Sequence, residues 1–364
     1  MDSLDSDTGT APVADEREKT RAPLRDAWYF ALPAEALTLG KTRPETILGE
    51  PILFGRGADG KVFALADFCP HRGIPLRFGR FDGREIECCY HGWRFDAAGT
   101  CTAIPALAEP GKTEIGRIRC RSYPVQELQG NIWVYIGDQS EAAMDAAPPV
   151  PVMEGLEDAV PRMREAVMLD GGIDDAVIGL MDPAHGPFVH QSWFWRSGRS
   201  VRLKEKRFEP SPWGFIMAKH RPSSNSRAYK ILGGTPETEI VFHLPSVRWE
   251  RITVGRHIMC HLTTLTPIGP KQTRITHSIY WTQPWLSVLR PLLRPFVRIF
   301  LRQDRDVMAL QQEGLKHDPP VLLLGDADAP ARWYFRLKQE ILRARAERRA
   351  FVNPLKPRTL RWRT

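Results

Sequence analysis

The chain lacks long apolar runs and a disulfide-rich pattern of cysteines. No stretch of its 364 residues approaches the roughly 20 consecutive apolar residues that a membrane-spanning helix needs. Residues 1–20 are polar and acidic, without the apolar centre of a secretory signal, so we expect a cytoplasmic protein. Six cysteines in a chain of this length do not indicate a disulfide framework.

Two redox fingerprints are missing as well. No Gly-x-Gly-x-x-Gly segment follows an expected strand, and the cysteines do not have the four-cysteine spacing of plant-type ferredoxins. We therefore expect no flavin or nicotinamide site in this chain. Electrons for any redox chemistry must then come from another protein.

Positive charge is concentrated at the C-terminal end. Residues 333–364 carry ten Lys and Arg against two acidic residues, which accounts for the net charge of +8. Such a segment can bind nucleic acid or anionic lipid. We favour a solvated helix whose arginine stems pack on a neighbouring domain or subunit, and we expect no nucleic-acid partner.

The most informative feature that is present consists of two short Cys–His pairs. Cys69-Pro-His71 is followed by Cys88-Cys-Tyr-His91, so two thiolates and two imidazoles can meet at one point. Four such ligands suit zinc, or an iron–sulfur cluster in which two histidines replace two cysteines on one iron. The spacing differs from the Cys-x2-4-Cys start of zinc fingers and ribbons, and this favours the cluster.

The sequence around these pairs resembles the two loops of a Rieske [2Fe-2S] domain. This resemblance implies that Cys69 and Cys88 bind one iron and that His71 and His91 bind the other, more exposed iron. Cys89, where the family often has proline, is left out of the ligand set.

One branch of that family is excluded by the loop sequences. The Rieske proteins of respiratory complexes carry an extra, disulfide-bonded cysteine in each loop, and Ile74 and Tyr90 stand at those positions here. The resemblance is therefore to the oxygenase and ferredoxin branch.

The pattern of strands, helices and turns predicts two domains. Short apolar runs separated by glycine-rich turns are expected to be strands at 51–54, 61–65, 85–88, 131–136, 214–218, 239–243, 258–264 and 274–281. Helices are expected at 176–189, with Asp174 as N-cap, and at about 291–313 and 331–350.

These elements divide the chain into unlike parts. We predict an all-β domain of the Rieske type at 23–140, and an α+β domain with helices over an antiparallel sheet at 152–350. A linker rich in Ala and Pro at 140–151 separates them. A disordered segment is expected at 1–22 and a basic tail at 351–364.

The second domain contains a second constellation, Asp182-Pro-Ala-His185-Gly-Pro-Phe-Val-His190. Two histidines and one carboxylate form the facial triad of non-haem Fe(II) oxygenases, which leaves positions open for O2. A histidine pair alone is weak evidence, but an upstream electron donor needs an acceptor site. The segment that follows Gln303 supplies two candidate carboxylates; we choose Asp304 as third ligand, with Asp306 as the alternative.

Taken together, the chain resembles the α subunit of a Rieske non-haem iron oxygenase, whose pattern is Asn-x2-Asp-x2-His-x4-His. The resemblance implies that His185 and His190 bind iron and that Asp182 bridges this iron to a Rieske histidine of a neighbouring subunit in a homotrimer. Gly179 stands where the family has Asn, which weakens the match only slightly.

This resemblance predicts an enzyme that incorporates oxygen from O2 by hydroxylation, dioxygenation or oxidative demethylation of a hydrophobic aromatic or polycyclic substrate. It implies a [2Fe-2S] cluster, a mononuclear Fe(II), and electrons from NAD(P)H through a separate reductase, with or without a ferredoxin. The alternatives are a Rieske ferredoxin-like electron carrier, which chain length disfavours, and a structural zinc protein.

Three further segments bear on partners and substrate. The aromatic residues at 193–195 are expected to wall a pocket or to belong to the core. The segment at 284–302, with an arginine at every fourth position from 290, suits a membrane-surface helix or a helix buried on one face, and we favour the second. Arginines near the cluster loops are candidates for docking an acidic redox partner: Arg72, Arg77, Arg80, Arg84 and Arg94.

Overall fold

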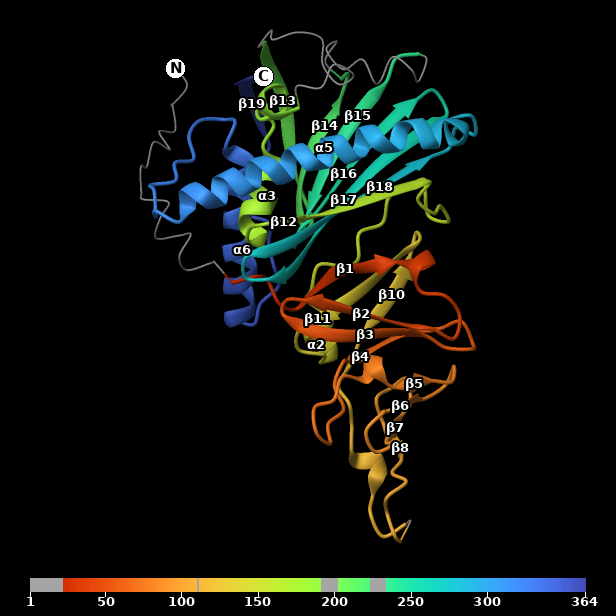
Figure 1. Cartoon of the computed structure of the whole chain (residues 1–364). Helices are drawn as coiled ribbons and strands as arrows, with labels where there is room; N and C mark the ends of the chain where they lie inside the picture. Colours follow the sequence, from red (N-terminus) through yellow and green to blue (C-terminus); the bar gives the residue numbers. More distant parts are fainter. Residues whose placement is uncertain (1–21, 110, 191–201, 223–233) are drawn as a thin grey trace.

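The computed structural model describes residues 22–109, 111–190, 202–222 and 234–364. The expected disordered segment, apart from its last residue, and the aromatic residues at 193–195 lie outside these ranges. The chain forms a helix-covered sheet at one end of the molecule and a smaller β domain at the other (Figure 1).

The described part of the N-terminal domain contains three antiparallel sheets, ordered β1-β11-β10, β2-β3-β4-β9 and β5-β6-β7-β8. Every residue of β11 is buried, because one face of this strand joins the domain core and the other packs against the second domain. The strands are β1 (Ala27–Pro33), β2 (Thr42–Ile47), β3 (Glu50–Arg56), β4 (Val62–Ala66), β5 (Arg80–Phe81), β6 (Ile86–Glu87), β7 (Arg94–Phe95), β8 (Cys101–Ala103), β9 (Ser122–Tyr123), β10 (Val125–Leu128) and β11 (Asn131–Ile136).

The C-terminal domain is built on an eight-stranded antiparallel sheet, ordered β12-β18-β17-β16-β15-β14-β13-β19. Its strands are β12 (Met163–Leu169), β13 (Leu203–Ser211), β14 (Gly214–His220), β15 (Glu237–His243), β16 (Val247–Val254), β17 (His257–Gly269), β18 (Gln272–Trp281) and β19 (Arg358–Arg363). Its helices are α3 (Ile173–Met181), α4 (Gly186–Val189), α5 (Leu286–Leu315) and α6 (Ala329–Ala346), and α2 (Glu141–Asp145) precedes the domain. The expected α+β class is confirmed.

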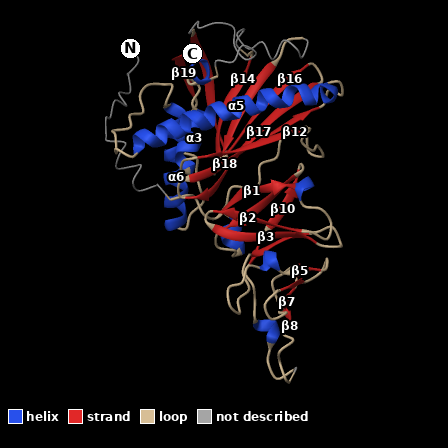
Figure 2. Cartoon of the chain, in the orientation of Figure 1, coloured by secondary structure: helices blue, strands red, loops and turns tan. Residues whose placement is uncertain are grey.

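The large sheet lies between the helices and the N-terminal domain. Alternate residues of a strand point to opposite faces. On β17, Cys260 and Leu262 pack with Trp28 and Trp133 of the N-terminal domain, whereas His261 points to the face that α5 crosses. Figure 2 shows α5 running across the sheet as a separate layer. One face therefore holds the two domains together and the other is free to form a site.

Buried polar contacts reinforce this junction. Thr266 donates its hydroxyl hydrogen to the carbonyl of Phe30 over 2.8 Å. The Asn131 side-chain amide lies 2.7 Å from the Tyr280 hydroxyl. Both contacts link β1 or β11 to strands of the large sheet, so the junction is specific as well as apolar.

The predicted helix at 176–189 is two helices. Helix α3 ends at Met181, Asp182 is its C-cap, and the short α4 begins at Gly186, followed by Pro187. Pro183 directly follows Asp182 and disfavours the helical conformation there, so Asp182 is extended, with a ψ of 116°. Pro187 lies in the first turn of α4, where a proline is tolerated. The predicted N-cap was also wrong: Gly172 is the N-cap, and Asp174 lies in the first turn, where it accepts hydrogen bonds from Tyr334 and Lys338.

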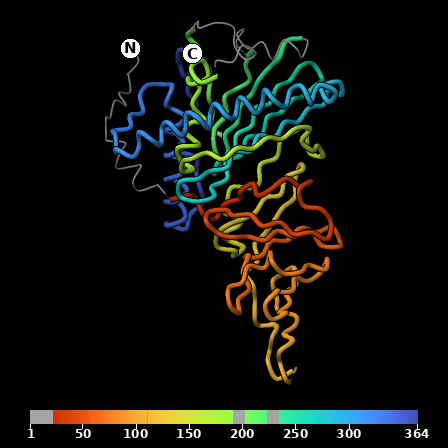
Figure 3. Tube along the Cα trace, in the orientation of Figure 1, coloured from red at the N-terminus to blue at the C-terminus, as the bar shows by residue number. Residues whose placement is uncertain are grey.

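The predicted tail at 351–364 is part of the sheet. Strand β19 pairs with β13, and its Leu360 and Trp362 are buried. Figure 3 traces the C-terminal end back to this edge of the sheet. The alternating pattern of arginines and apolar residues fits an edge strand, whose charges face solvent and discourage pairing with other chains. The predicted linker is likewise packed: it contains α2, and Ala147 and Val150 are buried between the domains.

The arginines of α5 turn toward the protein. Arg294 and Arg298 both donate to the buried carboxylate of Glu165 on β12, and Arg290 donates to the carbonyl of Arg162 over 3.3 Å. This arrangement supports the buried-helix interpretation over a helix that presents its arginines to lipid headgroups. Among the described helices, none combines the length and apolar character needed to cross a membrane.

Candidate metal centres

The two Cys–His loops follow β4 and β6 and share one backbone design. In each loop the cysteine amide donates to the carbonyl five residues later, and the cysteine carbonyl accepts from the amide four residues later. These hydrogen bonds are 2.8 and 2.9 Å long at Cys69 and 2.8 and 3.0 Å at Cys88. The fourth residue is Gly73 or Gly92, with φ of 73° and 66°, a conformation in which a side chain is strained. The glycines therefore allow each loop to close.

This design presents the four predicted ligands to one place. The Cys69 and Cys88 side chains are buried, whereas His71 and His91 are half-buried, with ring centroids 4.7 Å apart. Burial raises the pKa of the Cys69 thiol to about 11, and the neighbouring Cys88 adds to the effect. Two buried thiols beneath two outer imidazoles suit a [2Fe-2S] cluster with unlike iron atoms.

Aromatic neighbours fix the outer imidazoles. The Trp93 ring stacks on His71 with centroids 4.5 Å apart, and the Tyr90 ring lies 3.8 Å from that of His91. Cys89, left out of the predicted ligand set, is exposed. All six cysteines are free thiols, and neither Ile74 nor Tyr90 could form a disulfide.

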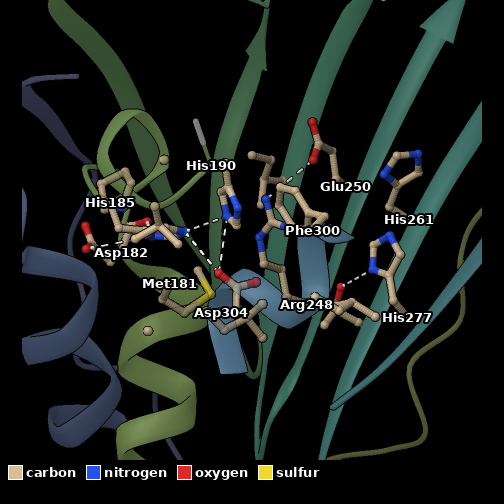
Figure 4. A pocket seen from close by; sticks show the side chains of 18 of the residues that line it. Met181, Asp182, His185, His190, Arg248, Glu250, His261, His277, Phe300 and Asp304 are labelled. Carbon is tan, nitrogen blue, oxygen red and sulfur yellow. Dashed lines mark hydrogen bonds and ion pairs between the residues drawn. The ribbon is translucent and has the colours of Figure 1, made fainter. Parts of the chain in front are cut away.

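The second predicted group comes together around the break between α3 and α4. His185 precedes α4, His190 follows it, and Asp304 lies on α5 (Figure 4). The Nε2 atoms of the histidines are 3.3 Å apart, and the nearer Asp304 carboxylate oxygen is 3.2 Å from His190 and 3.9 Å from His185. Two imidazoles and one carboxylate with this convergence suit a divalent iron. Asp306 is exposed and binds Arg305 instead.

A hydrogen bond from the Nδ1 atom of each histidine sets its tautomer. His185 Nδ1 donates to the carbonyl of Asp182 over 2.8 Å, and His190 Nδ1 donates to the Gln303 side-chain oxygen over 3.1 Å. With hydrogen on Nδ1, the Nε2 lone pairs point to the centre of the group. Burial lowers the pKa of His185 in spite of Asp304 and Asp182, which keeps its imidazole neutral and able to bind metal.

Asp182 sits at the outer edge of this centre. One carboxylate oxygen accepts from the Ala184 amide over 2.7 Å, and the other lies 3.7 Å from His185 Nδ1. The side chain keeps 32% of its surface exposed. It is therefore held in place on one side and accessible on the other.

Gln303 was not predicted as a site residue, although it directly precedes Asp304. We expect Gln303→Leu to lower iron affinity about tenfold, because His190 loses the acceptor that fixes its tautomer. Chelator competition measures this affinity, and the cluster absorbance should not change.

Two matched variants test this interpretation. Gln303→Glu keeps an acceptor and should retain wild-type iron affinity, and Gln311→Leu, on the same helix, should have no effect. Wild-type iron affinity in Gln303→Leu would contradict the positioning role of Gln303.

The His–His–Asp group opens into a cavity of about 1070 Å³ between the sheet and α3 and α5. Its lining is mostly Leu, Ile, Met, Val and Phe; Phe300 stacks on His190 with centroids 3.7 Å apart. One wall carries polar side chains that the sequence did not single out: Arg248, Glu250, His261 and His277. Their only signal in the sequence is polar residues at alternate positions of apolar strands.

Rieske-type loops followed by a sheet domain with a His–His–Asp group define a class: proteins that pair an iron–sulfur domain with a mononuclear non-haem iron centre. Comparisons with known proteins agree. The Rieske [2Fe-2S] domain family matches residues 27–124. Dicamba O-demethylase, oxygenase component, of Stenotrophomonas maltophilia is 34% identical over 279 residues, which cover 70% of this chain and 72% of that protein.

Other relatives match over shorter stretches. The 4beta-methylsterol monooxygenase of Methylococcus capsulatus is 42% identical over 128 residues, or 35% of each chain. The match thus spans about a third of that relative. A crystal structure of dicamba monooxygenase bound to dicamba aligns with a TM-score of 0.69 at 23% identity, over 90% of this chain and 100% of the other.

The chain therefore belongs to the Rieske non-haem iron oxygenases, as a member of the family of oxygenase (α) subunits. The predicted family is confirmed, and the predicted cofactor classes, a [2Fe-2S] cluster and a mononuclear iron, are those of this family. The relatives lend no support to a protein that only carries electrons.

Proposed function

We propose that this chain is the terminal component of a Rieske-type system that hydroxylates, dioxygenates or oxidatively demethylates a hydrophobic aromatic or polycyclic substrate. One observation carries this proposal: the His–His–Asp group opens into a large, mostly apolar cavity. An electron carrier has no use for such a space. The relatives named above act on sterol and aromatic compounds, and this supports the same broad substrate class here.

The proposed metal ligands are the converging side chains of the two centres. When bound, the cluster supplies single electrons and the Fe(II) supplies O2 activation. The protein binds the substrate beside the triad, orients it and excludes water. The ligands are Cys69, His71, Cys88 and His91 for the cluster, and His185, His190 and Asp304 for the iron.

The two centres lie toward opposite ends of the molecule. In Figure 1, β5–β8 lie at the end of the N-terminal domain that points away from the large sheet and α5. We propose a homotrimer in which each cluster serves the iron of the next subunit, with Asp182 as the contact between them. The exposed apolar side chains of Val288, Leu292 and Ile299 on α5 support further contact with a protein surface.

Metal content and product analysis test the proposed function. The holoenzyme should contain about three irons per chain. With a compatible reductase, NAD(P)H and a panel of aromatic, steroid and methoxy compounds, it should consume O2 and release an oxygenated or demethylated product. About two irons per chain and no product would instead support the ferredoxin-like alternative, and a colourless zinc protein would support the structural one.

We propose that the reductase, or a ferredoxin, docks at the cluster end of the molecule in the cytoplasm. All five arginines near the cluster loops are exposed, although Arg77 pairs with Asp67 and Arg94 with Glu87, each at 2.9 Å. A basic surface attracts an acidic partner over distances that salt screens.

The rate of cluster reduction should therefore fall as ionic strength rises. Stopped-flow absorbance at several salt concentrations measures this rate. Reduction by dithionite, a small chemical reductant, serves as the control for effects of salt on the cluster itself. A rate with the protein partner that does not depend on salt would contradict electrostatic docking.

A further inference from the structure

A continuous polar row crosses four strands of the sheet, and its members on β16, β17 and β18 line the cavity. Strand pairing places Arg248 on β16 opposite Thr263 on β17, Thr263 opposite His277 on β18, and His277 opposite Glu165 on β12. Directly opposed residues lie on the same face of a sheet. The next row pairs Glu250 with His261. A polar patch is thus built into the face that encloses the cavity.

The members of this patch contact one another. Arg248 and Glu250 form an ion pair at 3.5 Å, with side chains only 19% and 15% exposed. The Thr263 hydroxyl lies 2.8 Å from His277 Nδ1, and the ring centroids of His277 and His261 are 5.3 Å apart. The contact with Thr263 occupies one nitrogen of His277. His277 lines the cavity, and its Nε2 remains as a single donor or acceptor.

The patch has hydrogen-bonding groups but no net charge. The Arg248 guanidinium is balanced by the Glu250 carboxylate. Burial lowers the pKa of both His261 and His277, which keeps both imidazoles neutral. At the end of the row, Glu165 is bound by two half-exposed arginines of α5, Arg294 and Arg298. The surplus positive charge of this group lies outside the four-residue patch, because none of its three side chains lines the cavity. The lysines that line the cavity, at 204 and 206, lie on β13, with β14 and β15 between them and β16.

The neutral, hydrogen-bonding character of the patch favours some classes of substrate over others. An anionic ligand would lose its hydration in the cavity and would meet Glu250 without gaining a net positive charge. A hydroxyl or oxo group can instead exchange hydrogen bonds with the imidazoles and the ion pair. A pure hydrocarbon would displace water from these buried polar groups without replacing its hydrogen bonds.

The size of the cavity sets the other limit. Its volume of about 1070 Å³ lies just above the range of about 300–1,000 Å³ typical of pockets for drug-sized ligands. A single benzene ring would fill little of it. Figure 4 shows the patch beside the metal centre, so a ligand of several fused rings could contact both.

We propose that Arg248, Glu250, His261 and His277 form the specificity subsite of this enzyme, and that it holds an uncharged hydroxyl or oxo group of a polycyclic substrate while another carbon lies at the iron. This inference rests on the proposed oxygenase function. It adds that the substrate is neutral and carries a hydrogen-bonding group away from the reacting position.

Binding without turnover tests the subsite separately from the chemistry. Fluorescence anisotropy on the oxidised holoenzyme, without reductant, compares pyrene, 1-hydroxypyrene and 1-pyrenecarboxylate at pH 7. We expect 1-hydroxypyrene to bind at least about tenfold more tightly than either of the others. It alone can form hydrogen bonds with the patch without burying a charge. Equal affinities, or preference for the carboxylate, would overturn the proposal.

Two substitutions distinguish specific recognition from general packing. Glu250→Gln leaves the Arg248 charge uncompensated and should reverse the preference toward 1-pyrenecarboxylate. Glu239→Gln makes the same chemical change on β15, on the opposite face of the sheet, and should preserve the wild-type order. Loss of all three affinities together in Glu250→Gln, with the protein folded, would mean that the residue only supports the structure.

The two proposals fail in different ways. Selective binding of the hydroxyl compound, with no oxygenated product from any substrate in the panel, would leave the subsite standing and reject the oxygenase function. Product formation with rates and affinities that do not change in Glu250→Gln would reject the subsite and leave the oxygenase function standing.

Discussion

Asp182→Ala is expected to retain the cluster and the mononuclear iron and yet to lose about 100-fold in turnover. Asp182 is not a member of the metal-binding group, so both metals should stay bound. Its carboxylate borders His185 and remains 32% exposed, in a position to accept a hydrogen bond from a histidine of a neighbouring subunit. In the proposed trimer, this substitution removes the contact between the two centres.

The local role of Asp182 needs a control, because its carboxylate also holds a turn. It accepts a hydrogen bond from the Ala184 amide, and this turn carries His185. Asp182→Asn keeps an oxygen for that bond but removes the negative charge. If the charge couples the centres, both variants should be slow; if only the turn matters, Asp182→Asn should resemble the wild type.

A single-turnover experiment reads the coupling directly. The holoenzyme is reduced chemically, mixed with O2 and substrate, and followed by the visible absorbance of the cluster. In both variants we expect slow reoxidation with normal iron content. Normal turnover in Asp182→Asn and Asp182→Ala alike would refute the bridging role.

Asp304→Ala is expected to abolish substrate oxidation and to lower the iron content from about three to about two per chain. Asp304 supplies the only carboxylate of the described metal-binding group, and its oxygen is 3.2 Å from His190 Nε2. Two imidazoles alone form a weak site for Fe(II), which prefers an added oxygen ligand. The cluster absorbance should be unchanged, because its loops lie at the other end of the molecule.

Asp306→Ala is the matched control. Asp306 is on the same helix, two positions along, but its side chain is 61% exposed and binds Arg305. This variant should keep wild-type iron content and turnover. If Asp306→Ala lost the iron and Asp304→Ala kept it, the assignment of the third ligand would be wrong.

Local motifs made much of the metal chemistry predictable. Cys69 and Cys88 each begin a loop that closes on a glycine, so the ligand spacing encodes the loop geometry. The spacing of His185 and His190 likewise belongs to one short segment. The third iron ligand, Asp304, was harder to predict, because the sequence offers two acids close together. Only the orientation of α5 shows that Asp304 faces the cavity and that Asp306 faces solvent.

Some strands, and the end of one helix, were not predicted correctly, because tertiary contacts alter the sequence pattern by which such elements are recognised. Strand β19 looked like a basic tail, because an edge strand has charged residues on its exposed side and only a few buried apolar ones. Strands β12, β13 and β16 carry polar residues that line the cavity, form ion pairs or face solvent. These residues interrupt the alternation of apolar and polar positions that marks a half-buried strand. The stop after α3 depends on Pro183, which keeps Asp182 out of the helical conformation, and the predicted helix at 176–189 ran through this position.

By itself, the sequence determined the family, the cluster loops and the histidine pair, since each of these is encoded in residues close together along the chain. The tertiary structure alone decided which carboxylate joins the histidines and which polar side chains share the cavity. Those groups come from β16, β17, β18 and α5, and only strand register and helix orientation bring them together. Such long-range placement depends on the packing of the whole domain, and no local spacing records it.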